Sequence, residues 1–77
     1  MLSGTPRTFI GSTTFTVRGL RDAEGRSVLV EGLGKVAGVG SVTADPASGV
    51  VTVTATQLVD RADIADALES LGFALVP

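Results

Sequence analysis

The apolar residues of this chain follow two alternating periods, and the order of those periods is the strongest constraint on its fold. Residues 8–18 alternate in character, with Phe15 and Val17 two apart, which is the period of a half-buried strand. Leu29, Leu33 and Val36 are spaced four and three apart, which is the period of one helix face. The same change of period recurs in the second half, so the sequence predicts the order βαββαβ.

Glycines and short polar residues mark the boundaries of the first strand and helix. Gly11 interrupts the strand pattern and marks either a bulge or the true start of the strand. The loop over 19–25 leads into the helix, with Asp22 or Ser27 as N-cap, because their side chains accept hydrogen bonds from the free N–H groups of a first turn. Gly38 is expected to end the helix, since glycine adopts the left-handed conformation without penalty.

The middle of the chain has the pattern of a hairpin. Residues 39–44 and 50–54 are alternating, valine-rich segments. Between them, Pro46 and Gly49 have the backbone preferences of a tight turn. We therefore expect two antiparallel strands joined at 45–49.

A second helix is predicted over 60–71, with its apolar stripe on Ile64, Leu68 and Leu71. Asp60 is placed to cap it, and Gly72 is placed to end it. Residues 73–76 form the expected last strand.

This order indicates the α+β class: a ferredoxin-like βαββαβ sandwich, in which a four-stranded antiparallel sheet carries both helices on one face. Residues 1–7 have no periodicity and are expected to be a flexible tail, which leaves 8–77 as the domain. Phe9, Phe15 and Phe73 are expected in the core rather than on a base-stacking surface.

The residue types that are absent exclude several kinds of chemistry. The 77 residues include no cysteine and no histidine, which removes thiol nucleophiles, imidazole bases and zinc-finger sites. The chain is therefore not expected to be an enzyme or to carry a cofactor. Its net charge of −2 argues against nucleic acid as a partner. No apolar run reaches the ~18–20 residues that cross a bilayer, so we expect no membrane insertion and a cytoplasmic location.

The charges are unevenly distributed along the chain. Arg18, Arg21 and Arg26 lie around the first loop, whereas Asp60, Asp63, Asp66 and Glu69 crowd the second helix. The three arginines are a candidate patch for an anion or an acidic protein partner. The competing interpretation is an ordinary solvated surface.

Asp22 and Glu24 are candidate oxygen ligands for a hard cation on the same loop. Two exposed carboxylates make a weak site, because Ca²⁺ takes six to eight oxygens. We therefore interpret Asp22 as an N-cap and Glu24 as a solvated charge.

Several segments, in this order and spacing, resemble the heavy-metal-associated domain of copper chaperones and of metal-pumping P-type ATPases. The resemblance covers about Phe15 to Phe73. Its segments are Phe-Thr-Val-Arg-Gly-Leu at 15–20, Val-Leu-Val-Glu-Gly-Leu at 28–33, Val-Ala-Gly-Val at 36–39, the strands at 42–45 and 49–53, and the helix with its Gly-Phe ending at 64–73.

The family's metal loop reads Gly-Met-x-Cys-x-x-Cys, and here the matching positions read differently. Leu20 stands at the buried Met, while Asp22 and Gly25 stand at the two cysteines. The resemblance implies a non-catalytic interaction or regulatory module of a metal-ion transport or homeostasis system, copper among the metals, with a degenerate metal loop. It implies a protein partner, a metal-transport ATPase or a related domain, and a monomer rather than a dimer.

One alternative of another class stays open. The same βαββαβ order serves regulatory modules that sense small molecules or anions and dimerise. In those modules the glycine-rich turn after the first strand contacts the ligand, and residues 19–25 would take that role.

Overall fold

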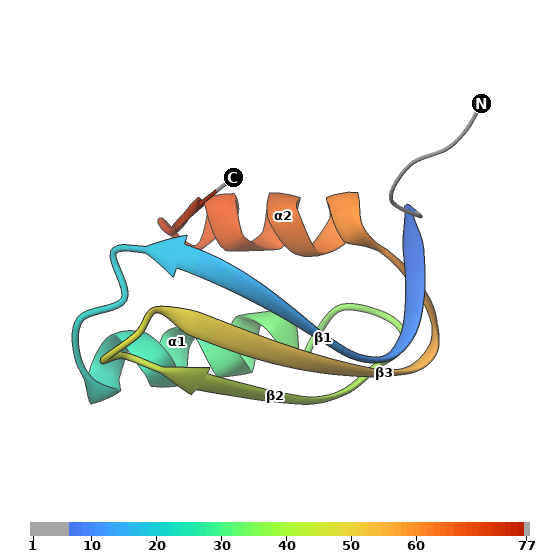
Figure 1. Cartoon of the computed structure of the whole chain (residues 1–77), viewed down its shortest axis with the longest axis horizontal. Coiled ribbons are helices and arrows are strands. Elements are labelled where there is room, and N and C mark those ends of the chain that lie inside the picture. The colour runs from blue at the N-terminus through green and yellow to red at the C-terminus, as the bar shows by residue number, and fades with distance from the viewer. Residues whose placement is uncertain (1–6, 77) are drawn as a thin grey trace.

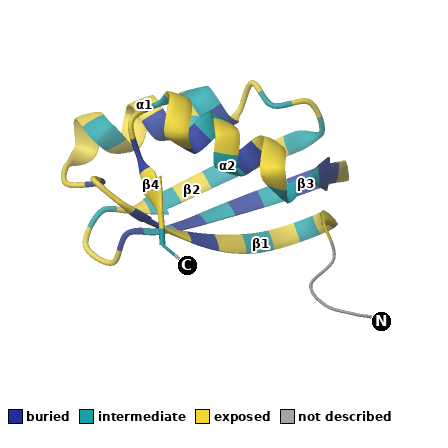
Figure 2. Ribbon diagram, turned by 90° about the horizontal axis from the view of Figure 1, so that it is seen from above, coloured by how far each residue is buried: buried dark blue, intermediate teal, exposed yellow. Residues whose placement is uncertain are grey.

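The chain folds in the predicted order around one four-stranded antiparallel sheet (Figure 1). The computed structural model describes residues 7–76, and the strands lie in the order β2-β3-β1-β4. Both helices cover one face of the sheet (Figure 2). This is the ferredoxin-like sandwich that the sequence predicted. The elements are β1 (Thr8–Arg18), α1 (Ala23–Leu33), β2 (Val39–Asp45), β3 (Val50–Asp60), α2 (Arg61–Ser70) and β4 (Ala74–Leu75).

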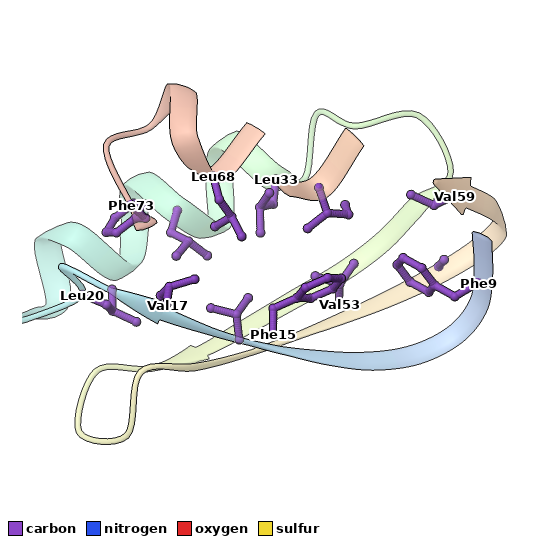
Figure 3. Close-up of a cluster of buried hydrophobic side chains, with 13 residues drawn as sticks. Phe9, Phe15, Val17, Leu20, Leu33, Val53, Val59, Leu68 and Phe73 are labelled. Atoms are coloured by element: carbon purple, nitrogen blue, oxygen red, sulfur yellow. The ribbon is translucent and has the colours of Figure 1, made fainter. Parts of the chain in front are cut away.

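The core is a single apolar layer between the sheet and the helices (Figure 3). Phe9, Phe15 and Phe73 are all buried in it, as predicted. The rings of Phe9 and Phe15 meet edge to face at 6.1 Å, and the Arg61 guanidinium lies 5.6 Å from the centroid of Phe9. No polar side chain is buried among the described residues, so apolar burial at roughly 1.5–3 kcal/mol per large side chain stabilises this fold. Its fully buried members are Leu29, Leu33, Val51, Val53, Ile64 and Leu68.

The structure has an irregularity at Gly11, but its extra residues are on β3, where residues 56–58 lie between the partners of Phe9 and Gly11. The strand does not begin at Gly11, because β1 starts at Thr8. The pairing register between β1 and β3 shifts between Phe9 and Gly11, and Gly11 has φ +83°. Beyond the shift, Phe9 pairs with Val59. This pairing explains why β3 runs to Asp60 rather than ending at residue 54 as the sequence suggested.

Helix α1 begins after one of its two predicted N-cap residues, but it ends earlier than expected. Asp22 is the N-cap, whereas Ser27 lies inside the helix, so that alternative is wrong. The helix ends at Leu33 and not at Gly38. The Val36 N–H donates to the Leu33 carbonyl, 3.0 Å away, which is the i to i+3 bond of a tight turn. Val36 still packs against the core, which is why its spacing extended the predicted helix.

Gly38 has a different role from the predicted one. Its φ is +92°, and its carbonyl accepts the Thr56 N–H at 2.8 Å. The glycine therefore shapes the entry into β2 after the turns that follow α1.

The hairpin turn follows the prediction closely. The Asp45 carboxylate accepts the Ala47 N–H at 3.0 Å, and the Gly49 N–H donates to the Asp45 carbonyl at 2.8 Å. Gly49 has φ +75°, a conformation that glycine adopts without steric cost.

Helix α2 has both predicted boundary residues. The Asp60 carboxylate accepts the Ala62 N–H at 2.8 Å, and Gly72 follows the helix with φ +93°. Leu71 is the C-cap rather than a helical residue, and β4 is only two residues long.

The start of the described chain contacts the junction between β3 and α2. Residues 1–6 of the predicted tail lie outside the described residues. Arg7 is described: its carbonyl accepts the Arg61 N–H at 2.7 Å, and its guanidinium lies 3.5 Å from the Asp60 carboxylate.

Candidate functional site

Two buried side chains connect the loop between β1 and α1 to the apolar core. Leu20 and Phe73 are each 7% exposed. Gly19 has φ +97°, and a Cβ there would lie 3.7 Å from the Phe73 ring. The turn therefore rests on the apolar core while its polar residues face solvent. The sequence predicted Phe73 in the core, and the family resemblance placed Leu20 at a buried position; both residues are buried.

Asp22 and Gly25 face each other across the first turn of α1. The Asp22 Oδ1 accepts the Gly25 N–H at 2.8 Å, and its carbonyl accepts the Arg26 N–H at 3.0 Å. A Cβ on Gly25 would lie 3.4 Å from Asp22 Oδ1 and 3.7 Å from Leu20 Cδ1. Asp22 thus caps the helix, as expected, and residues 22 and 25 are close enough for their side chains to meet.

The donors on this loop do not fit a soft metal ion. Asp22 and Glu24 are exposed and supply hard oxygens, and Gly25 has no side chain. Cu(I) prefers sulfur, and Ca²⁺ takes more oxygens than these. Within residues 7–76 there is no group of three or more carboxylate, histidine or cysteine side chains that could hold a metal.

Arg18, Arg21 and Arg26 all lie near this loop: at the end of β1, in the loop and in the first turns of α1. All three are exposed, and none forms an ion pair with a carboxylate of residues 7–76. The structure therefore places the three predicted arginines on and beside the β1–α1 loop, without carboxylate partners among residues 7–76.

The predicted solvated face of α2 is confirmed in part. Asp63, Asp66 and Glu69 are exposed. Asp60 differs, because it is half-buried, caps α2 and pairs with Arg7.

Sequence reasoning did not single out the outer edge of β2. The signal that could have found it is the absence of lysine, arginine and proline from residues 39–45, since such residues usually protect an edge strand.

The described part of the chain holds no pocket. No helix within residues 7–76 has the length and apolar character that a bilayer crossing needs.

Solved structures share this architecture. No protein-family model matches the chain, and no curated protein matches it in sequence. A structure of the CopZ metallochaperone is 24% identical with a TM-score of 0.80, over 84% of this chain and 98% of that one. The CsoZ metallochaperone is 25% identical with a TM-score of 0.80, over 90% and 100%.

A third similar structure comes from a transporter. The N-terminal domain of a potential copper-translocating P-type ATPase from Bacillus subtilis, in its Cu(I)-loaded state, is 24% identical with a TM-score of 0.77, over 87% of this chain and 85% of that one. The chain has the fold of these chaperones and ATPase domains.

Proposed function

We propose that residues 8–77 form a heavy-metal-associated-like domain of a metal-ion homeostasis system, which acts as a non-catalytic interaction or regulatory module. The observation that carries this proposal is the fold shared with two metallochaperones, each at a TM-score of 0.80 over at least 84% of the chain. A shared fold does not by itself fix a function. The rest of the proposal is therefore argued from the residues of the β1–α1 loop and from the charges around it.

The metal loop of this domain is degenerate. Asp22 and Gly25 hold the positions of the two ligand cysteines, and the Asp22 carboxylate is used as a helix cap. Leu20 supports the loop where the family has Met, since both are apolar and similar in volume. The domain keeps the scaffold of a metal-binding loop without soft ligands on it.

The basic patch, Arg18, Arg21 and Arg26, is the docking surface for an acidic protein partner. Its charges are exposed and lack carboxylate partners within residues 7–76, so they are available to steer association. The partner is the soluble domain of a metal-transport ATPase or a related domain. The chain works in the cytoplasm and meets this partner as a monomer.

Reversing one patch charge is expected to weaken this association. Arg21→Glu should raise the Kd for the isolated metal-binding domain of a copper- or zinc-transporting ATPase from the same genome about fivefold at low salt, which corresponds to roughly 1 kcal/mol for an exposed ion pair. The measurement is a titration followed by amide chemical shifts, and the difference should shrink as salt screens the charges.

Lys35→Glu is the matched control. Lys35 is exposed and lies beyond the far end of α1, and its reversal changes the net charge by the same amount. It should change the Kd less than twofold. Equal losses from both variants, or no binding by the unmodified chain, would contradict the docking proposal.

A further inference from the structure

The outer edge of β2 is an unused pairing surface. The strand lies at one margin of the sheet (Figure 1), and over its seven residues every second backbone N–H and C=O points away from β3. Within residues 7–76 no segment pairs with that side. Exposed edges of this kind are templates for another strand.

Apart from the irregularity at its start, this edge lacks the usual protection against pairing. Residues 39–44 contain no charged residue and no proline, and Asp45 is the one charge at the strand's end. The register shifts between Val39 and Ser41, but from Ser41 onward the strand pairs with β3 without interruption. The regular part of the edge is therefore both accessible and neutral.

We propose that this edge pairs with the β2 edge of a second copy, antiparallel and centred on Val42. In that register Val42 faces its own counterpart, Ser41 faces Thr43, and Asp45 faces Val39. No carboxylate opposes a carboxylate, so the strand is complementary to itself. A symmetric dimer through one of the charged surfaces is less favourable. Contact between two copies of the basic patch, or between two copies of the acidic face of α2, would place like charges together, which is destabilising.

The side chains on the open face of the sheet are also compatible with pairing to a second copy. Ser41 and Thr43 lie beside Thr54 and Thr52 of β3, and Ser12 of β1 contacts Thr54 through their hydroxyls at 3.0 Å. Around the centre of the joined sheet this face carries hydroxyl groups and no charge. Two copies therefore continue one neutral, polar surface across the pair.

The contact is small, because it involves one strand from each copy. Stable interfaces bury about 1,200–2,000 Å² in total, and a single strand pair offers less. The dimer is accordingly weak and forms at millimolar chain concentration. This goes beyond the proposed function, in which a monomer meets its partner at much lower concentration.

Two double variants test the register directly, because Ser41 and Thr43 are both exposed in the monomer. Ser41→Lys with Thr43→Lys places a lysine opposite a lysine twice in the dimer. Ser41→Lys with Thr43→Glu places a lysine opposite a glutamate twice. Sedimentation equilibrium over micromolar to millimolar concentrations should show the dimer constant weakened about tenfold in the first and strengthened in the second, because each cross-strand pair contributes a factor of roughly 2–5.

A control separates the edge from the sheet face. Thr14→Lys with Thr16→Lys adds the same charge at exposed positions of β1, which β3 separates from the β2 edge. It should leave the dimer constant within about twofold, because the distances between the added charges of the two copies are longer there. The proposal is overturned if the unmodified chain stays monomeric at millimolar concentration. It is also overturned if the dimer constants of the two edge variants change in the same direction, or if the β1 control weakens the dimer as much as the edge lysines do.

Discussion

Replacing Asp22 and Gly25 together by cysteine is expected to create a Cu(I) site in a chain that has no thiol. A Cβ at residue 25 lies 3.4 Å from the present Asp22 Oδ1, so two thiols at these positions can reach one ion. Both would sit at the start of α1, where the free N–H groups lower the thiol pKa and favour the thiolate that binds metal. Sulfur is also the ligand that Cu(I) prefers.

The double variant is expected to remain folded. Asp22→Cys removes the cap on the Gly25 N–H, which costs about 1 kcal/mol. Gly25 is helical and does not have a positive φ, so a cysteine there recovers about 0.3 kcal/mol relative to glycine, because cysteine is a weaker helix former than alanine. Its Cβ would lie 3.7 Å from Leu20 Cδ1, an ordinary contact distance. The net cost of the two changes is below about 1 kcal/mol.

The measurement is competition with a colorimetric Cu(I) chelator, run beside circular dichroism. The unmodified chain and Asp22→Ser with Gly25→Ser should both lose Cu(I) to the chelator, since neither contains sulfur at the loop. A folded cysteine variant that also loses Cu(I) would show that the loop does not have the geometry of the family's metal loop. The likeness would then be one of fold alone.

Gly49→Ala is expected to destabilise the domain by about 3 kcal/mol. Its φ of +75° costs an L-residue roughly 1–2 kcal/mol. In addition, the new Cβ would lie 2.7 Å from the Val17 carbonyl oxygen, a backbone atom that has little freedom to move. Relief of this contact would disturb the hydrogen bond from the Val17 N–H to the Gly49 carbonyl, now 2.9 Å, worth about 1 kcal/mol. Urea unfolding measures the total.

Gly72→Ala separates the two causes. Its φ is +93°, but nothing lies within 4 Å of a Cβ there. It should therefore cost only the conformational term, roughly 1–2 kcal/mol. Equal losses at both glycines would mean that the hairpin turn yields to the new Cβ, contrary to this prediction.

The sequence predicted the elements well where the apolar period and the local turn chemistry agreed. At the start of α2 the apolar stripe and the capping residue agree, and the structure places Asp60 as the N-cap. At the end of α1 these signals conflicted, because Val36 continues the helical spacing while packing on the core from a turn. The length of β3 was missed for a related reason: residues 56–58 are exposed, and the strand continues beyond them because Val59 and Asp60 pair with distant β1.

The loop was predicted in its parts. Capping by Asp22 follows from local sequence and burial of Leu20 from the family resemblance, and both are confirmed. The closeness of the three arginines also follows, since they are near in sequence. The open edge of β2 was not predicted, because strand order in a sheet depends on which distant strands pair.

The short strand β4 gives the domain two time scales of opening. It is attached through the Val17–Leu75 and Arg18–Ala74 pairs and through the Val76 N–H to the Thr16 carbonyl at 2.8 Å, and both of its residues are exposed. Little apolar surface resists its detachment, so its amide protons exchange with solvent through local fraying. Phe73 is buried, so we expect the fraying to stop there and the amides of β3 to exchange only when the whole domain unfolds. The last strand is then expected to leave and rejoin the sheet many times within the lifetime of a single folded core.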